Sequence, residues 1–159
     1  MDDAVLQRIG KALGMIPSGC GILTVTDGDF RTGMLTSWIQ QAGFDPPAVS
    51  IAVKKGRPIE PLIDRTGRFV LNLIGEDPRA MFRHFGRGFE PDEDAFAGLK
   101  ISTQDGGVAL EDAIAILSCR VAGKFDAGDH WLYVGRVENA TTRDGARSYV
   151  HLRKSGLTY

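Results

Sequence analysis

The sequence predicts a mainly antiparallel β-barrel or sandwich with a few short helices at its edge. Apolar runs of strand length outnumber helical patterns, and strands and helices do not alternate as parallel βαβ units require. Glycine supplies 20 of the 159 residues, nearly twice its usual share, which fits a chain with many tight turns. Because neither a repeat nor a low-complexity linker is present, we expect residues 1–159 to form a single domain.

The N-terminal third predicts one helix followed by three strands. Apolar side chains recur on one face over residues 2–13, after acidic residues that suit a helix N-terminus. Two apolar stretches, residues 20–26 and 30–41, flank an Asp-Gly-Asp turn at residues 27–29 and predict a hairpin. A third strand is predicted at residues 48–53, after a break rich in glycine and proline.

The rest of the chain predicts two further helices and four strands. Pro58 suits the first turn of a helix over residues 58–66, and a second helix is predicted to begin at Asp77-Pro78. The polar, turn-rich residues 86–95 predict a loop. In order along the chain, the strands are predicted at residues 68–74, 113–124, 131–141 and 147–152.

Charge and cysteine content exclude several classes of protein. With 19 basic and 20 acidic residues, the chain lacks the basic excess expected of a nucleic-acid or membrane-surface protein. The longest apolar run, residues 113–117, is too short to span a bilayer. Cys20 and Cys119 lie far apart and are interpreted as buried thiols, so we expect a cytoplasmic protein without disulfides.

The common catalytic motifs are absent. No G-x-S-x-G elbow, phosphate-binding G-x-x-x-x-G-K-[ST] loop or G-x-G-x-x-G fingerprint occurs, which argues against hydrolase, NTPase and Rossmann functions. The chain is also too short for a doubly wound dinucleotide site with room for a second ligand. The three histidines are scattered, and no C-x-x-C or H-x-x-x-H spacing occurs, so we expect no metal site.

The most informative segment is residues 33–47, GMLTSWIQQAGFDPP, where polar groups cluster at the end of an apolar strand. Hydroxyls and amides beside a tryptophan suit a planar heteroaromatic ligand, because its edge needs hydrogen bonds and its faces need aromatic or apolar cover. A strand that runs into a polar surface turn explains the pattern equally well. The candidate ligand contacts in this segment are Thr36, Ser37, Trp38, Gln40 and Gln41.

This segment resembles the flavin reductase-like proteins, which have an FMN-binding split barrel of antiparallel Greek-key strands. The resemblance extends over nearly the whole chain, and it is closest to the flavin reductase module at the C-terminus of some flavodiiron proteins of oxygenic phototrophs. Its other matching segments are PSGCGILTVTDGD (17–29), the KKGR turn (54–57), RFVLNLI (68–74), RHFGRGF (83–89), DEDAFAGL (92–99), GDH (128–130) and HLRKSGLTY (151–159).

The resemblance implies an NAD(P)H:flavin oxidoreductase that binds FMN, with FAD as an alternative. NADH or NADPH is expected to deliver hydride to flavin N5, and the electrons then pass to free flavin, oxygen or a partner such as a monooxygenase or diiron protein. The resemblance also implies a homodimer with FMN at the interface. Two alternatives remain: a non-enzymatic FMN-binding electron carrier, and a split-barrel binding domain without flavin.

The same resemblance assigns roles to residues of this chain. The flavin ring is expected to contact the strand-end residues Thr36, Ser37, Trp38, Gln40 and Gln41. Three cations on one turn suit the FMN phosphate, with a second clamp from Arg83 or Arg87 around Phe85. A solvated basic face is the alternative for both groups. The three cations are Lys54, Lys55 and Arg57.

Two more positions complete the expected site. Asn72 is either a flavin contact or a structural amide, because an amide among apolar neighbours must find hydrogen bonds. His130 is the catalytic candidate, expected to orient the nicotinamide or tune the flavin rather than to transfer a proton. The basic tail is expected to approach the phosphates of NAD(P)H through Arg147, His151, Arg153 and Lys154.

Overall fold

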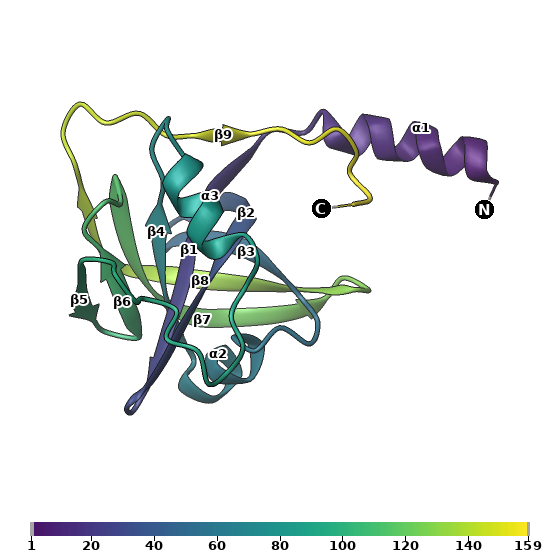
Figure 1. Ribbon diagram of the computed structural model, residues 1–159. Helices are drawn as coiled ribbons and strands as arrows, with labels where there is room; N and C mark the ends of the chain where they lie inside the picture. Colours follow the sequence, from purple (N-terminus) through teal and green to yellow (C-terminus); the bar gives the residue numbers. More distant parts are fainter. Residues whose placement is uncertain (1, 159) are drawn as a thin grey trace.

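Six antiparallel strands close into a barrel in the computed structural model, which describes residues 2–158 (Figure 1). The strand order is β2-β3-β8-β7-β4-β1, and pairing between β1 and β2 closes the sheet. Neighbours in this order are often distant in sequence, as Greek-key connections require. The predicted mainly antiparallel barrel is therefore confirmed. The strands are β1 (Ser18–Asp27), β2 (Phe30–Phe44), β3 (Pro47–Lys54), β4 (Arg68–Leu73), β7 (Ala115–Asp126) and β8 (His130–Thr142).

The interior of the barrel is filled by the inward-facing residues of all six strands. Leu23 and Val25 of β1 face Ile51 and Val53 of β3, and all four side chains are fully buried. Helix α2 (Glu60–Thr66) covers one end of the barrel through Leu62 and Ile63, which are part of the same cluster. Fully burying each such side chain contributes about 1.5–3 kcal/mol. The inward set on β1 and β3 follows the period-2 alternation expected of strands.

A second apolar cluster covers the outer face of β1. Helix α3 (Arg79–Phe85) and the hairpin of β5 (Ile101–Gln104) and β6 (Gly107–Leu110) lie over this face. Ile22 and Cys20 point into this cluster, so β1 is buried on both of its faces. The β5–β6 hairpin is absent from the sequence prediction, although its Asp-Gly turn between short β-like runs is the usual hairpin signal.

Helix α1 (Asp3–Gly14) stands away from the barrel, and the C-terminal tail runs beside it (Figure 1). The Asp2 carboxylate caps the helix by accepting a hydrogen bond from the amide of Ala4 at 3.2 Å. Strand β9 (Val150–His151) pairs with the start of β1 and leads into the tail. Within residues 2–158, no helix is both long enough and apolar enough to cross a membrane.

Candidate functional site

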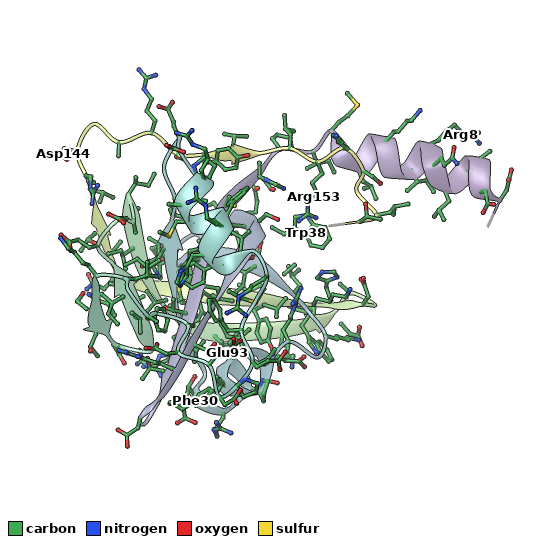
Figure 2. All side chains as sticks on the ribbon, viewed as in Figure 1. Arg8, Phe30, Trp38, Glu93, Asp144 and Arg153 are labelled. Atoms are coloured by element: carbon green, nitrogen blue, oxygen red, sulfur yellow. The ribbon has the colours of Figure 1, made fainter. Side chains whose placement is uncertain are left out.

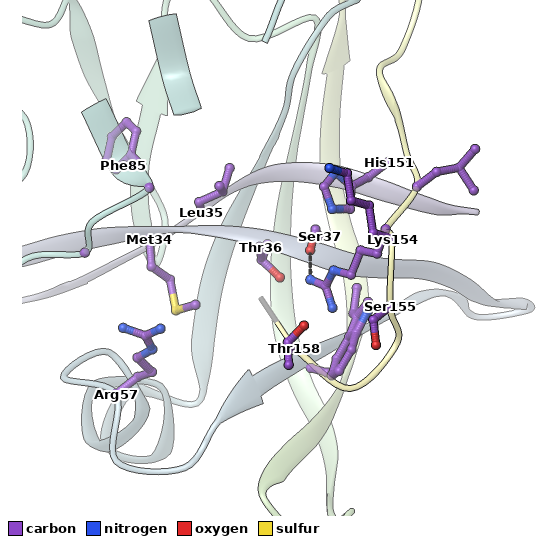
Figure 3. Close-up of a pocket in the computed structure, with 16 residues that line it drawn as sticks. Met34, Leu35, Thr36, Ser37, Arg57, Phe85, His151, Lys154, Ser155 and Thr158 are labelled. Atoms are coloured by element: carbon purple, nitrogen blue, oxygen red, sulfur yellow. Dashed lines mark hydrogen bonds between the residues drawn. The ribbon is translucent and has the colours of Figure 1, made fainter. Parts of the chain in front are cut away.

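A cavity of about 500 Å³ opens between β2 and the C-terminal tail (Figure 3). Its wall combines one stretch of β2, one residue of β3, the turn after it, the end of α3 and the tail. Segments far apart in the sequence therefore build one site. The lining residues are Met34, Leu35, Thr36, Ser37, Trp38, Ala52, Arg57, Phe85, Gly86, Gly88, His151, Leu152, Arg153, Lys154, Ser155 and Thr158.

A β-bulge in β2 shapes the cavity wall. Gly19 pairs with Ile39 and Gly21 pairs with Thr36, so the single residue between the two glycines faces both Ser37 and Trp38. A bulge turns side chains away from strict alternation, and bulges are frequent beside functional sites. Ser37 and Trp38 therefore join Thr36 at the cavity, as the sequence analysis expected of this segment.

Thr36 presents an unpaired hydroxyl to the cavity. The residue is 3% exposed, and its Oγ1 has no hydrogen-bond partner among residues 2–158. A buried polar atom without a partner costs about 1–3 kcal/mol, so this position suits a ligand that supplies the missing bond. The neighbouring Ser37 is already engaged, because its carbonyl accepts a hydrogen bond from the Ser18 hydroxyl and its own hydroxyl accepts one from Arg153.

The cavity is positively charged. Three cations occur among its described lining residues and no carboxylate does. Arg57 lies at one end beside Met34, whereas Lys154 lies at the other end with His151 (Figure 3). The third cation, Arg153, lies 4.6 Å from the centre of the Trp38 ring. This distribution favours an anionic ligand with an aromatic part.

His151 enters the cavity wall from β9. Its Nδ1 is buried and has no hydrogen-bond partner within residues 2–158. Burial lowers the pKa of this imidazole from its usual value, and the positive charge of Arg153 lowers it further. The ring is therefore neutral around pH 7, and its unpaired Nδ1 can donate or accept one hydrogen bond, depending on the tautomer.

His130, the expected catalytic residue, lies behind the cavity wall rather than in it. It begins β8, is 5% exposed, and its Nδ1 is 2.8 Å from a carboxylate oxygen of Asp129. Its ring centre is 4.7 Å from that of Trp38 at an angle of 50°. His130 therefore touches the cavity through Trp38 and can fix the orientation of that indole.

The cations of the KKGR turn do not converge. Lys55 is ion-paired with Asp126 at 2.6 Å and lies 4.3 Å from the centre of the Trp131 ring, away from the cavity. Lys54 is exposed at the end of β3, and only Arg57 lines the cavity. A shared turn places cations close in sequence, but successive side chains leave it in different directions.

The residues of the second expected phosphate clamp, Arg83, Arg87 and Phe85, do not come together at the cavity either. Arg83 is exposed on α3 and does not line the cavity. Arg87 makes two hydrogen bonds to the Glu93 carboxylate, at 3.0 and 3.1 Å. Phe85 lines the cavity at its edge but is 1% exposed, because it is part of the apolar cluster under α3.

Two of the expected ring contacts face elsewhere. Gln40 and Gln41 line a separate hollow of about 280 Å³ together with Cys20 and Tyr149. They follow the bulge, which shifts the alternation of β2 and turns them from the cavity that Thr36 lines.

Asn72 has the structural role that the sequence analysis left open. Its side-chain amide donates to the carbonyls of Val108 and Ile22, at 3.0 and 3.3 Å, and its Oδ1 accepts from the amide of Leu110 at 2.8 Å. These three hydrogen bonds join β1 and β6 to β4. Asn72 is fully buried and does not line the cavity.

The two cysteines are buried and unpaired, as predicted. Burial raises the pKa of Cys20 to about 11 and that of Cys119 to about 12, so neither is a ready nucleophile. Among residues 2–158, His, Cys, Asp and Glu side chains form no group of three or more that could hold a metal ion.

The residues of the cavity fit a flavin. The volume lies within the usual range for small-molecule sites. Thr36 offers a hydrogen bond for the edge of a heteroaromatic ring, Trp38 offers an aromatic surface, and Arg57 offers charge for a phosphate. With the closed antiparallel barrel around it, this cavity defines a candidate flavin-binding protein.

Comparison with known proteins agrees with this class. Residues 13–156 match the family described as flavin reductase like domain, and the chain belongs to that family. It is 40% identical over 152 residues to diflavin flavoprotein A 1 of a Synechocystis strain, covering 94% of this chain and 26% of the relative. The chain thus spans about a quarter of the length of the curated relatives it matches. Their names agree with the predicted resemblance to a flavodiiron module.

Solved structures share the fold. The NADH:FAD oxidoreductase of Streptomyces globisporus has a TM-score of 0.84 at 23% identity, over 96% of this chain and 89% of that one. Nitrilotriacetate monooxygenase component B of Mycobacterium thermoresistibile has a TM-score of 0.81 at 25% identity, over 96% and 86% of the two chains. The neighbours show the fold, and membership of the flavin reductase like family makes a flavin the class of cofactor that the cavity is expected to hold.

Proposed function

We propose that the protein is an NAD(P)H:flavin oxidoreductase that binds FMN in the cavity between β2 and the tail. The observation that carries this proposal is the buried, unpaired hydroxyl of Thr36 at the wall of a cavity lined by cations. In a family whose cofactor class is a flavin, that hydroxyl is suited to the polar edge of the ring. FAD remains the alternative flavin, because a structural neighbour of this chain is an NADH:FAD oxidoreductase.

Each part of the cavity has a proposed role. Thr36 and Ser37 hydrogen-bond the ring edge, and Trp38 contacts the flat ring system. Arg57 binds the phosphate, which narrows the predicted cation cluster to one residue. Lys154 and His151, at the opposite end, approach the nicotinamide cofactor, whether NADH or NADPH.

The chemistry that a bound flavin supplies is acceptance of hydride from NAD(P)H at N5 and onward transfer of the electrons. The side chains of this chain bind and orient the reactants and keep water from the cavity, because hydride transfer needs no protein acid or base. Free flavin, oxygen and a partner protein such as a monooxygenase or diiron protein are the candidate acceptors. Similarity to a diflavin flavoprotein and to a monooxygenase component supports the partner-protein acceptor.

His130 has a positioning role in this proposal. Its ring packs against Trp38 and its Nδ1 is held by Asp129, so it fixes the indole that contacts the flavin. We expect His130→Ala to lower the rate of flavin reduction by NAD(P)H more than it weakens FMN binding. Stopped-flow reduction and equilibrium titration measure the two effects separately, and equal losses would make His130 a flavin-holding residue instead.

The proposal is tested by anaerobic addition of NADH or NADPH to the FMN-loaded protein. Bleaching of the flavin absorbance is expected with at least one nicotinamide. Yellow protein that neither nicotinamide bleaches would favour a non-enzymatic FMN carrier, and protein that takes up no flavin would favour a binding domain.

Two variants locate the flavin. Thr36→Val removes the unpaired hydroxyl at nearly constant shape, and we expect FMN binding to weaken about fivefold. Gln40→Ala alters a residue that faces the separate hollow, and FMN binding should be unchanged. The opposite pattern would place the flavin in the other hollow.

We further propose a homodimer that uses α1 and the tail. Large apolar side chains are exposed here, including Met15 at 78%, Ile16 at 62% and Leu152 at 61%. Such a concentration on one part of the surface is typical of an interface. Met15→Asp should lower the dimer fraction in sedimentation equilibrium, whereas Phe125→Asp, at an exposed site on β7, should not. A wild-type protein that stays monomeric at high micromolar concentration would contradict the dimer.

A further inference from the structure

The C-terminal residues 152–158, here called the strap, cross the cavity between two anchors. At one end, β9 pairs with Ser18 and Gly19 of β1. At the other end, the amide of Gly156 donates to the carbonyl of Gly10 in α1 at 2.7 Å. Between these anchors, Arg153, Lys154 and Ser155 face the cavity. The strap is thus one wall of the cavity rather than a surface extension.

Arg153 fastens the middle of the strap to the barrel. Its guanidinium lies 4.6 Å from the centre of the Trp38 ring, and its Nη2 donates to the Ser37 hydroxyl (Figures 2 and 3). Trp38 and Ser37 are also the groups proposed to contact the flavin ring. A flat ring and the guanidinium therefore compete for the same indole surface and the same hydroxyl.

The outer anchor of the strap packs closely against α1, and glycines on both segments allow this close approach. A Cβ on Gly156 would lie 2.1 Å from the Cβ of Leu13, and one on Gly14 would lie 2.9 Å from the carbonyl oxygen of Arg153. The strap backbone thus lies directly on α1. That helix stands off the barrel with Leu6 and Leu13 more than a third exposed, so within one chain little buried apolar surface opposes its movement.

We propose that the strap is a gate over the flavin cavity and that Arg153 is its latch. In the closed form Arg153 occupies Trp38 and Ser37. In the open form Arg153 leaves them, and the strap moves with α1 to admit the ring. The gating of a flavin rests on the proposed function, whereas the latch itself is a property of the free protein. A cation–π contact and a hydrogen bond together correspond to about a tenfold change in the ratio of closed to open forms.

Acrylamide quenching of Trp38 fluorescence tests the latch without any ligand. The chain has two tryptophans, so Trp131→Phe leaves Trp38 as the only reporter. Acrylamide is neutral, and its access does not depend on the charge of the strap. In this background, Arg153→Ala should raise the quenching constant about twofold or more, because it uncovers the indole face that the guanidinium occupies. Gly156→Ala should do the same by displacing the strap from α1.

Lys154→Ala is the matched control. It removes a charge from the neighbouring strap residue and leaves Arg153 over Trp38, so the quenching constant should stay that of the parent. Circular dichroism melting curves confirm that each variant is folded. Unchanged quenching in both Arg153→Ala and Gly156→Ala, or an equal rise in Lys154→Ala, would overturn the latch.

The rate of FMN association tests the gate. In the wild type, the observed stopped-flow rate should level off with rising FMN concentration, at the rate of strap opening. In Arg153→Ala the plateau should rise about tenfold or disappear. A wild-type rate that rises linearly without a plateau would overturn the gate. If FMN does not bind at all, the proposed function fails, while the quenching result still decides the latch.

Discussion

The two walls of the cavity are held in different ways. The β2 wall, Met34 to Trp38, belongs to a closed barrel, and β2 pairs with β1 on both sides of the bulge at Ser37 and Trp38. The opposite wall is the strap, which is fixed by the two-residue strand β9, by Arg153 and by α1. A barrel strand cannot leave without loss of the core, whereas the strap can. A site of this kind combines one rigid surface for binding with one movable surface for access.

The largest effect is expected on the rigid side. Asn72→Ala removes the acceptor of the Leu110 amide and the donor to the Val108 carbonyl. The contact between β4 and β6 therefore loses buried hydrogen bonds. We expect the free energy of unfolding to fall by about 2–3 kcal/mol. Urea denaturation measures this change. Ser102→Ala, at an exposed position on β5, is the control and should be nearly neutral. An equally small effect for Asn72→Ala would contradict the stabilising role of these buried hydrogen bonds in the barrel that carries the β2 wall.

The next effect concerns ligand affinity at the end of the cavity away from the strap. Arg57→Ala removes the lining cation at that end, and FMN binding should weaken about tenfold. Riboflavin, which lacks the phosphate, should bind both proteins alike. Lys55→Ala is the matched charge control, because Lys55 is engaged by Asp126 and Trp131. Isothermal titration with both ligands measures this, and equal losses for FMN and riboflavin would refute the phosphate assignment.

The smallest effect is a titration shift on the strap side. The pKa of His151 is lowered first by burial and then by Arg153, so Arg153→Ala should bring it closer to its usual value of 6.5. NMR titration of the His151 ring protons measures this pKa. A wild-type value at or above 6.5 would contradict the burial of this side chain.

The same shift links His151 to stability. Just below pH 6.5 the unfolded chain binds a proton at this position that the folded chain does not, so stability rises with pH in that window. His151→Gln should remove this contribution, and the difference between the two denaturation series isolates it. An increase of stability on acidification that depends on His151 would contradict the lowered pKa of this imidazole in the folded protein.

Sequence reasoning was most successful where local pattern decides the outcome. Alternating apolar residues predicted β1 and β3, and the polar strand end at Thr36 to Trp38 does line the cavity. Gln40 and Gln41 were misplaced relative to that cavity because a bulge shifts the alternation after Ser37. The bulge is a pairing event between two strands, so one strand's pattern cannot reveal it.

Other parts of the site depend on tertiary placement. Lys55 forms an ion pair with Asp126 on β7 and a cation–π contact with Trp131 on β8, and both partners lie some seventy positions further along the chain. The tail lies on the cavity because β9 pairs with β1 and because glycines allow it to lie on α1. Strap residues Ser155 and Thr158 lie in the tail segment that carries the resemblance, but their side chains alone do not mark them as cavity residues. The β5–β6 hairpin, in contrast, could have been predicted from its Asp-Gly turn.

The central claim is that flavin binds between β2 and the strap, and a cavity-filling variant tests it most directly. Ala52 lines the cavity from β3, so Ala52→Trp places a large side chain in that space. Ala122→Trp, at an exposed position on β7, is the control for added bulk. An FMN titration of the three folded proteins, followed by flavin fluorescence, should show binding by the wild type and by Ala122→Trp and none by Ala52→Trp. FMN binding by Ala52→Trp with wild-type affinity would contradict the claim.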